Sequence, residues 1–282
     1  MMPAIFTVDV EDWFHILDVA GAPAMSDWDR LPSRVEANFR RLLDLCNDAG
    51  VKITCFFLGW AAARFPGLVR EAAAGGHEVA SHGYGHRLVY EQSPAEFYED
   101  VLKARLLLED ILGQPVKGYR GPGFSVTAET PWFFEELVRA GYEYDSSVFP
   151  AARGHGGLRG DLFGPYRMET ESGPLLEFPI TVTEVWGRPM CFFGGGYLRV
   201  FPYALVRRMA QRVLEEGRPV VFYAHPREID PDQPRLAMNL KRRFKSYVGL
   251  RGMAGKIRRL LQDFPITNFA RFRAEFGDSL KD

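Results

Sequence analysis

The sequence predicts an α/β fold: one barrel-like domain. Strand-like apolar runs alternate with helix-like segments along the 282 residues, and no low-complexity linker or internal repeat interrupts them. Strands and helices that alternate at this spacing imply parallel strands joined by crossover helices. Polar residues also follow several of the strands directly. A barrel gathers such residues at one mouth, where folds of this kind place their chemistry.

The elements of the first half are marked by periodicity and by their end signals. Residues 5–8 and 52–59 are β-branched and aromatic runs, which predict buried strands. Residues 33–49 carry apolar side chains at helical spacing, and Gly50 ends that helix. Residues 66–76 form a second predicted helix, stopped by two glycines.

A capping box predicts the start of the next helix. Ser93 is its N-cap, Pro94 takes the first helical position and Glu96 follows three residues after the cap. Further strands are expected within residues 77–83, 116–123, 142–148, 175–181 and 219–226, with helices at 131–140 and 202–216. The Gly-rich residues 153–165 are expected to be irregular.

Composition limits the class of protein. Hydrophobic residues make up 46% and charged residues 25%, which is typical of a globular protein with a sizeable core. A formal net charge of −1 gives no argument for nucleic acid or membrane partners. The three separated cysteines do not form a disulfide framework and suit a reducing compartment. With no signal peptide and no apolar stretch of spanning length, a cytoplasmic location is expected.

Acidic and imidazole side chains follow two of the predicted strands. The first strand ends in three carboxylates, Asp9, Glu11 and Asp12, and like charges there require something to offset their repulsion. His82 and His86 lie four residues apart in a Gly-rich turn, so both imidazoles can reach one ion. Two histidines and a carboxylate form the ligand set of a catalytic divalent site, most often zinc.

Two further strands end in Arg120 and His225. Each feature has an ordinary structural explanation when taken alone: a solvated acidic loop, a chance histidine pair, an ion-pair partner and a core histidine. Four strand ends decorated together favour a functional site.

In this order, the acidic pair, H-x-x-x-H, R-x-P and a late strand ending in histidine resemble the NodB-homology polysaccharide deacetylases, carbohydrate esterase family 4. "FTVDVEDWF", "FFGGGYLRVFPY" and "YAHPREIDPDQPR" resemble its exosortase-associated, exopolysaccharide-locus branch. The resemblance implies a distorted (β/α)7-type barrel, a single domain over residues 1–282. Residues 235–282 would be a basic helical extension packed on that barrel. The implied activity is removal of N-acetyl groups from amino sugars with a divalent metal, most commonly Zn²⁺.

The resemblance also implies site roles. The family's first motif, Thr-Phe-Asp-Asp-Gly, supplies a base and a metal ligand, but residues 9–13 read Asp-Val-Glu-Asp-Trp. One register makes Asp9 the base and Glu11 the ligand, and the other makes Glu11 the base and Asp12 the ligand. Strand alternation places Asp9 and Glu11 on one face, which favours the first register. His82 and His86 complete the ligand set.

The remaining motifs match residue by residue. Arg120 and Pro122 fit the third motif, with Arg120 expected to hold the base through a two-pronged hydrogen bond and Pro122 expected to contact the substrate. His225 fits the fifth motif as the general acid. Asp145 fits the acid that tunes this histidine, and a backbone N–H near Asp145 or Ser146 is expected to bind the oxyanion.

Aromatic side chains and one glycine run are candidates for substrate contact. Trp13 is expected to stack on a sugar face, although core packing is the favoured explanation for any single aromatic residue. Tyr197 is expected to contact the substrate. "FFGGGYLR" (192–199) is a candidate substrate loop. The basic stretch 241–259 is either a solvated face of terminal helices or a surface for an anionic membrane or a lipid-diphosphate-linked glycan.

The function these residues indicate is metal-dependent N-deacetylation of N-acetylhexosamine units in a bacterial exopolysaccharide or its precursor. The expected partner is therefore a glycan, lipid-linked in one version. Two alternatives remain: hydrolysis of a cyclic amide or imide on a similar barrel, and glycan binding by a catalytically inactive scaffold.

Overall fold

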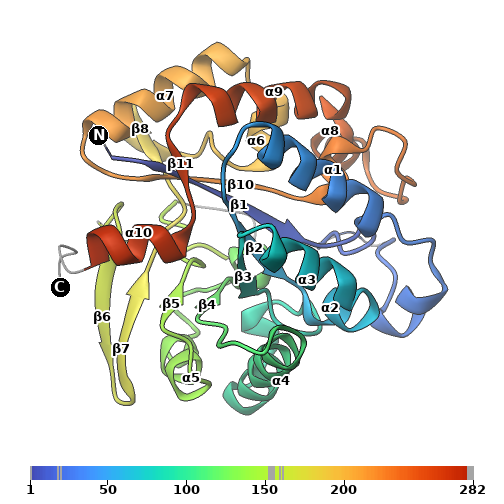
Figure 1. Cartoon of the computed structure of the whole chain (residues 1–282), viewed down its shortest axis with the longest axis vertical. Coiled ribbons are helices and arrows are strands. Elements are labelled where there is room, and N and C mark those ends of the chain that lie inside the picture. The colour runs from blue at the N-terminus through green and yellow to red at the C-terminus, as the bar shows by residue number, and fades with distance from the viewer. Residues whose placement is uncertain are drawn as a thin grey trace.

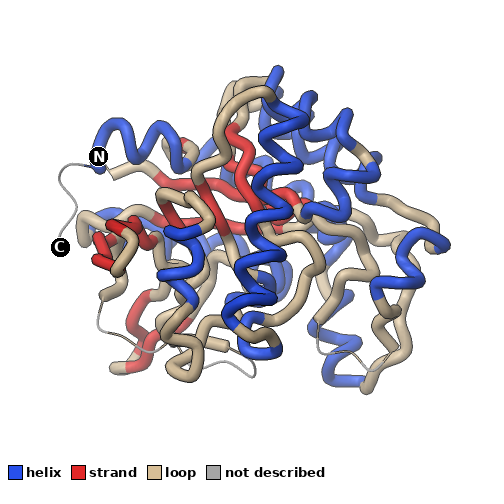
Figure 2. Tube along the Cα trace, turned by 90° about the horizontal axis from the view of Figure 1, so that it is seen from below, coloured by secondary structure: helices blue, strands red, loops and turns tan. Residues whose placement is uncertain are grey.

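A curled sheet forms the centre of the molecule. The computed structural model describes residues 2–17, 19, 21–151, 156–158, 160 and 162–277. Strands follow the order β10-β1-β2-β3-β4-β5-β7-β6, and helices lie around the outside of the curl (Figures 1 and 2). This path is a half-barrel of α/β type, which confirms the predicted fold class.

The strands of the sheet are β1 (Ala4–Val10), β2 (Thr54–Phe57), β3 (Glu78–Ser81), β4 (Gly118–Tyr119), β5 (Tyr144–Asp145), β6 (Tyr166–Thr170), β7 (Gly173–Glu177), β10 (Val220–Ala224) and β11 (Ile266–Thr267). A separate hairpin consists of β8 (Thr183–Val185) and β9 (Arg188–Met190).

The helices are α1 (Val35–Asp48), α2 (Gly59–Arg64), α3 (Pro66–Ala74), α4 (Pro94–Leu112), α5 (Phe133–Arg139), α6 (Gly195–Val200), α7 (Tyr203–Glu215), α8 (Leu240–Tyr247), α9 (Leu250–Asp263) and α10 (Phe269–Phe276). Short 3-10 turns include η3 (Pro122–Phe124) and η4 (Pro226–Ile229).

Most of these elements lie where the sequence predicted them. The capping box at Ser93 is present, with the Glu96 N–H donating to the serine hydroxyl over 3.3 Å. The pairs from β10 through β7 are parallel, as alternation predicted, whereas β6 and β7 form an antiparallel pair that it did not. Part of the Gly-rich stretch 153–165 lies outside the described residues.

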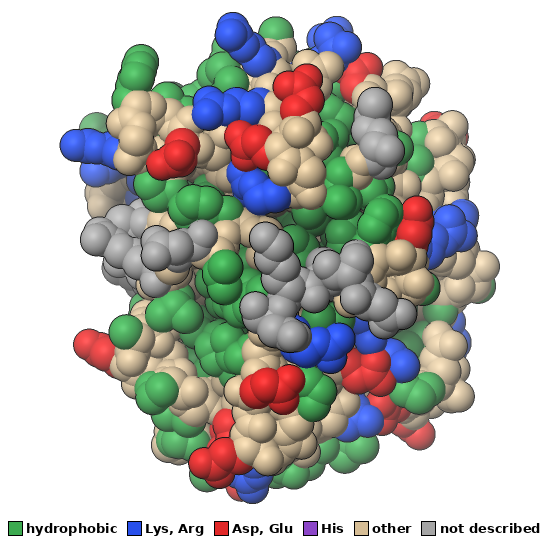
Figure 3. Space-filling view, turned by 90° about the vertical axis from the view of Figure 1, so that its left-hand side faces the viewer, with side chains coloured by type: hydrophobic (Ala, Val, Ile, Leu, Met, Phe, Trp, Pro, Cys, Tyr) green, Lys and Arg blue, Asp and Glu red, His purple; other side chains and the backbone are tan. Residues whose placement is uncertain are grey.

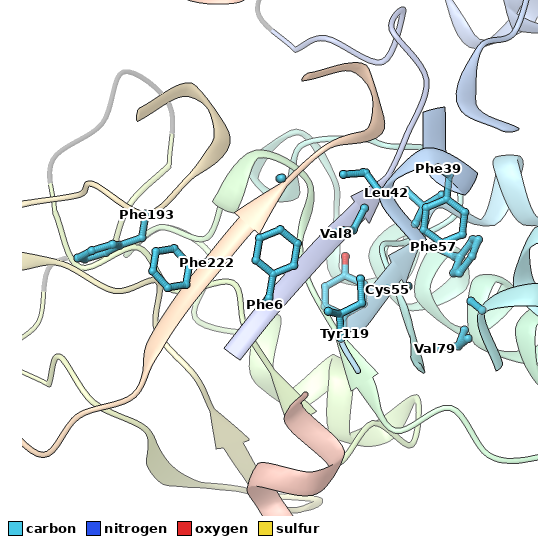
Figure 4. Close-up of a cluster of buried hydrophobic side chains, with 14 of the residues drawn as sticks. Phe6, Val8, Phe39, Leu42, Cys55, Phe57, Val79, Tyr119, Phe193 and Phe222 are labelled. Carbon is cyan, nitrogen blue, oxygen red and sulfur yellow. The ribbon is translucent and has the colours of Figure 1, made fainter. Parts of the chain in front are cut away.

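Strand alternation divides β1 between two cores. Phe6 and Val8 face outward into the large cluster beneath the helices, where Figure 4 shows them with Phe39, Phe57 and Phe222. Ile5 faces inward, in a second cluster inside the curl. Thr7 and Asp9 share the parity of Ile5, so they also point into the interior.

The last helix closes the amino-terminal end of the curl. The N–H of Phe269 donates to the hydroxyl of Thr54 over 3.0 Å, and that of Ala270 donates to the Glu78 carboxylate over 2.9 Å. Thr54 and Glu78 begin β2 and β3, so α10 covers the ends of the strands opposite to Asp9. A functional site is therefore expected at the carboxyl ends of the strands.

The rest of the C-terminal part packs on the side of the sheet. Helix α9 contacts α1, α6 and η4, and Lys256 on α9 donates to the carbonyl oxygens of Leu198 and Phe201 over 2.7 and 2.8 Å. The side facing the viewer in Figure 3 carries hydrophobic side chains at its centre, with charges of both signs above and below. Among the described residues, no helix is both long enough and apolar enough to cross a membrane.

One glycine is required by close packing between β4 and β5. A Cβ on Gly118 would lie 2.0 Å from Cζ of Tyr144, whose hydroxyl is tied to Glu78 over 2.9 Å. We expect Gly118→Ala to lower the free energy of unfolding by about 1–3 kcal/mol, since the ring cannot retreat without breaking that bond. Urea denaturation measures this loss.

Gly67 provides the matched control. It lies in α3 and an added Cβ meets nothing within 4 Å. Gly67→Ala should leave stability unchanged or raise it by up to about 1 kcal/mol, because alanine is the better helix former. Equal losses at both positions would contradict the packing account.

Candidate active site

Four strands bring the predicted chemical groups to one end of the sheet. Asp9 lies near the end of β1 and Glu11 follows it, His82 and His86 follow β3, Arg120 follows β4 and His225 follows β10. The carboxyl ends of parallel strands share one edge, so groups far apart in the chain meet there. Arg120 is 0% exposed, while the His225 side chain keeps 17% of its surface exposed.

The two histidines and Glu11 converge on a common point. Glu11 Oε1 lies 3.2 Å from His82 Nε2 and 3.1 Å from His86 Nε2, and the three side chains are buried. Their ligand atoms all lie within 4.8 Å of one another. Two imidazole nitrogens and one carboxylate oxygen at this spacing match a divalent cation site that leaves positions open for water or substrate.

Hydrogen bonding leaves both ring nitrogens available to an ion. His82 Nδ1 donates to the Arg120 carbonyl over 2.7 Å, which leaves the lone pair on Nε2 facing Glu11. His86 Nε2 is buried and faces Glu11 Oε1 without a well-aligned hydrogen bond. A buried nitrogen that lacks a good hydrogen bond costs free energy, so a cation bound at this point fits the residues present.

The turn carrying His86 is held by α4. Both carboxylate oxygens of Asp100 accept backbone N–H groups, from Tyr84 over 2.7 Å and from Gly85 over 2.9 Å. His86 adopts a positive φ of 54°, which is unusual for a residue with a side chain. Backbone strain of this kind occurs at functional sites. No sequence pattern pointed to Asp100, which lies in the middle of α4.

The environment of Glu11 favours its charged form. Burial by itself would favour the neutral acid, but the neighbouring imidazoles of His86, His225 and His82 outweigh burial and hold the pKa of Glu11 well below its usual range. An ionised carboxylate is the form that binds a cation.

Arg120 fixes the second acid of the site, Asp9. Its Nη1 donates to Asp9 Oδ1 and to Thr7 Oγ1, each over 2.7 Å. Its other nitrogens donate to Ser146, from Nε to the carbonyl and from Nη2 to the hydroxyl. The predicted two-pronged bond to the base was wrong: a single bond reaches Asp9, because β5 lies close enough to take the remaining donors.

His225 is held by an acid three residues later. Glu228 Oε2 accepts from the His225 backbone N–H over 3.0 Å and lies 3.3 Å from Nδ1. Glu228 Oε1 accepts from Arg199 Nε over 3.2 Å. Burial lowers the pKa of His225, but the carboxylates of Glu11, Glu228 and Asp9 outweigh burial and raise it. Sequence reasoning missed Glu228, although an acid three residues after His225 was a signal that could have found it.

A glycine makes room for this acid. A Cβ on Gly195 would lie 1.6 Å from Glu228 Oε2, and one on Gly194 would lie 2.1 Å from the Tyr223 ring. Only glycine permits approach this close. The glycine run in "FFGGGYLR" therefore serves first to seat Glu228 and Tyr223 beside His225.

These groups line one cavity of about 810 Å³. A cavity of this size is within the range of small-molecule and cofactor sites. Its walls include Asp9, Glu11, His15, His86, Phe124, Gly196, Tyr197, Arg199, Val200, His225, Arg227, Lys241, Arg242, Phe244 and Lys245.

Comparison with known proteins places the sequence. Residues 22–144 match the polysaccharide deacetylase family, and residues 146–274 match a domain of unknown function, DUF3473. Each of these matches covers less than half of the chain.

Curated relatives match part of this chain over part of their own length. A peptidoglycan-N-acetylglucosamine deacetylase of Bacillus cereus is 29% identical over 97 residues, which is 34% of this chain and 35% of that protein. The peptidoglycan-N-acetylglucosamine deacetylase PgdA of Listeria monocytogenes is 36% identical over 72 residues, 26% of this chain and 16% of that protein. The chain thus spans about a third or less of these relatives.

Solved structures share the fold over nearly the whole chain. A Mycobacterium smegmatis structure assigned to the polysaccharide deacetylases has a TM-score of 0.64 at 21% identity and covers 98% of this chain and 91% of its own. The Puue allantoinase has a TM-score of 0.63 at 18% identity and covers 98% of this chain and 90% of its own. At these identities the likeness concerns the fold alone.

Asp12, the third carboxylate after the first strand, has a structural role. Asp12 Oδ2 accepts from the Arg34 and Val35 N–H groups over 3.1 and 3.3 Å, at the start of α1, and from the Ser33 hydroxyl. Among the described residues, neither cluster able to hold an ion includes Asp12. The register that made Asp12 the metal ligand is therefore corrected: the carboxylate replaces a missing cap on α1.

The predicted role of Asp145 as partner of His225 is also corrected. Asp145 lies on β5, where its carboxylate accepts from the Ser147 N–H over 3.1 Å and pairs with Glu177. Burial raises the pKa of Asp145 to about 6 and raises that of Glu177 well above its usual value. Glu228 is the acid in contact with His225.

The expected oxyanion donor is engaged elsewhere. The Ser146 N–H donates to the Tyr119 carbonyl over 3.0 Å as the sheet continues, and the Ser147 N–H is taken by Asp145. Both N–H groups are therefore already hydrogen-bonded within the protein, one to a neighbouring strand and one to the Asp145 carboxylate.

The structure places the three predicted sugar-contacting residues in different surroundings. Tyr197 lines the cavity. Trp13 is 6% exposed in a cluster with Trp28 and Trp60, and its Nε1 donates to the Pro32 carbonyl over 3.0 Å, so core packing replaces the predicted stacking role. Pro122 is buried in η3 and its neighbours Gly123 and Phe124 form the wall instead.

The two first-motif acids can be separated by metal content. We expect Glu11→Gln to lower bound zinc by at least tenfold, because a neutral amide replaces the anionic ligand. Asp12→Asn should keep the zinc and instead lower the melting temperature, since it weakens the start of α1. Inductively coupled plasma mass spectrometry of the purified variants measures the zinc. Zinc lost from Asp12→Asn and retained in Glu11→Gln would reverse the assignment.

Proposed function

We propose that this chain is a metal-dependent carbohydrate N-deacetylase. Its substrate would be N-acetylhexosamine units of a bacterial exopolysaccharide or its precursor. The observation that carries the proposal is the buried trio Glu11, His82 and His86, with the Asp9–Arg120 pair behind a cavity that Asp9, Glu11, His86 and His225 line. The deacetylase match over residues 22–144 and the names of the curated relatives support the same activity.

The trio would hold the metal, and Zn²⁺ suits two imidazoles and one carboxylate. A bound divalent ion of this kind supplies a water molecule with a pKa of about 7 and polarises a carbonyl oxygen. His82 and Glu11 are pre-aligned for this by the Arg120 carbonyl and the imidazole cluster.

Asp9 is the proposed base. Arg120 occupies its Oδ1, so Oδ2 is the oxygen that takes the proton from the attacking water. The guanidinium, itself fixed by Ser146 and Thr7, keeps the carboxylate oriented. Oδ2 lies 3.8 Å from His225 Nε2, so base and acid line the same small volume.

His225 is the proposed acid. An amine is a poor leaving group and must be protonated as the amide bond breaks. Glu228 holds the Nδ1 side, which leaves the Nε2–H directed into the cavity to give its proton to the departing nitrogen. The raised pKa of His225 keeps the imidazolium populated near neutral pH.

The alternatives are tested by their products. Acetate released from N-acetylglucosamine oligosaccharides by the zinc-loaded protein supports deacetylation. Ring opening of a cyclic imide without acetate release would favour the second hydrolase activity. Oligosaccharide binding with neither product would favour a glycan-binding scaffold.

Metal binding and acid catalysis should separate on mutation. We expect His82→Ala and His86→Ala to lose bound zinc and acetate release together, because each removes one of three ligands. His225→Ala should retain zinc and lose activity by about 10²–10⁴-fold, the typical contribution of a general acid. Zinc retained after loss of both His82 and His86 contradicts the ligand assignment.

Glu228 should set the alkaline side of the pH–rate profile. The carboxylate raises the pKa of His225, so Glu228→Gln should lower that pKa. The protonated acid is then lost at lower pH, and the falling alkaline limb of kcat shifts toward acid. The exposed Glu215→Gln is the matched control and should leave the profile in place. A Glu228→Gln profile that does not move would show that Glu228 does not tune the acid.

A further inference from the structure

One end of the cavity is basic. Lys241, Arg242 and Lys245 from α8 and Arg227 from η4 line the same space as His225. Glu11 and His86, two of the proposed metal ligands, line the same cavity beside Asp9. A substrate that fills the cavity therefore meets a cation site and a cationic wall in one binding event.

Arg227 has donors without partners. Its Nε and Nη1 are buried and make no hydrogen bond to any described residue. The nearby Arg199, by contrast, is paired with Glu228 over 3.2 Å. Unpaired guanidinium N–H groups in a cavity wall favour an anionic ligand with several acceptor oxygens, which phosphate supplies in a matching geometry.

Helix α8 places apolar side chains next to these charges. Lys241 and Lys245 are one turn apart, as are Leu240 and Phe244, so each pair forms a stripe along the helix. Leu240 is 84% exposed and Phe244 61% exposed, and Val200 on α6 adds a further exposed apolar side chain at 47%. Phe244 and Val200 also line the cavity, so the apolar strip runs from its wall out to the surface.

The position of α8 is fixed from within the site. Arg199 donates to the carbonyl oxygens of Lys245, Ser246 and Val248 over 3.0, 3.1 and 2.9 Å. The same side chain binds Glu228, which holds His225. The Asn239 side chain caps the helix, accepting from the Arg242 N–H over 2.9 Å. The basic wall is thus part of the built site and not a loose surface.

We propose that this end of the cavity binds a phosphate or diphosphate ester carrying an apolar chain, so that the substrate is a lipid-linked amino-sugar glycan. Arg227, Lys241 and Lys245 take the phosphate oxygens, and Phe244 and Leu240 cover the first part of the lipid. This inference rests on the proposed deacetylase function and names the substrate class for the same site.

Binding of farnesyl diphosphate, a short lipid diphosphate, tests the proposal. Isothermal titration uses the full-length protein as purified and again in the presence of a chelator, which excludes binding through the metal. The wild type should bind farnesyl diphosphate at least tenfold more tightly than inorganic diphosphate. The double variant Lys241→Ala/Lys245→Ala, and independently Arg227→Gln, should weaken both ligands about tenfold.

Two controls match these changes. Arg243→Ala removes an exposed charge of the same helix that does not line the cavity, and it should change affinity less than twofold. Leu240→Ser/Phe244→Ser should weaken farnesyl diphosphate and leave inorganic diphosphate unchanged, whereas Leu106→Ser on α4, 53% exposed, should affect neither.

Three outcomes overturn the proposal. Arg243→Ala weakening both ligands as much as the lysine pair would indicate general surface charge. Farnesyl diphosphate affinity surviving in the lysine pair and in Arg227→Gln would remove the subsite. Cosedimentation with phosphatidylglycerol vesicles lost in the lysine pair, with farnesyl diphosphate binding intact, would assign the wall to a membrane surface. These titrations need no catalysis, so missing acetate release would count against the deacetylase function and not against this subsite.

Discussion

The active end of this molecule depends on one buried guanidinium. Arg120 is 0% exposed and joins three strands, donating to Thr7 and Asp9 on β1 and to Ser146 after β5. Its own carbonyl accepts from His82 after β3. An unpaired buried charge costs about 3–5 kcal/mol, so the four strand ends are held in register by the need to satisfy this one group. The orientation of Asp9 is therefore coupled to the orientation of His82.

A second buried arginine performs the same task for the other half of the site. Arg199 joins α6 to the end of α8 and to Glu228, and Glu228 in turn holds His225. Gly195 makes this possible because a side chain there would collide with the carboxylate. His225 and the basic wall both come from residues 146–274, whereas Glu11, His82, His86 and Arg120 come from the part of the chain before them. The cavity therefore combines side chains from both parts of the chain.

Sequence patterns were sufficient for groups whose neighbours are set by the strands themselves. Alternation along β1 directs the side chains of Thr7 and Asp9 into the interior of the curl. The carboxyl ends of parallel strands share one edge of the sheet. Asp9, Glu11, His82, His86, Arg120 and His225 were predictable for this reason. Asp12, Asp145 and Trp13 were not, because each has a partner from a distant segment: the start of α1, Glu177 on β7 and the cluster of Trp28 and Trp60.

The sequence by itself determined the fold class, the parallel order of the elements and the chemical types gathered at the strand ends, since periodicity, caps and motif spacing are local properties of the chain. Tertiary structure alone decided which carboxylate faces the histidines, that Glu228 and not Asp145 contacts His225, and that α8 lines the cavity. Such choices depend on side chains competing for the same donors across space, and no local pattern encodes the outcome of that competition.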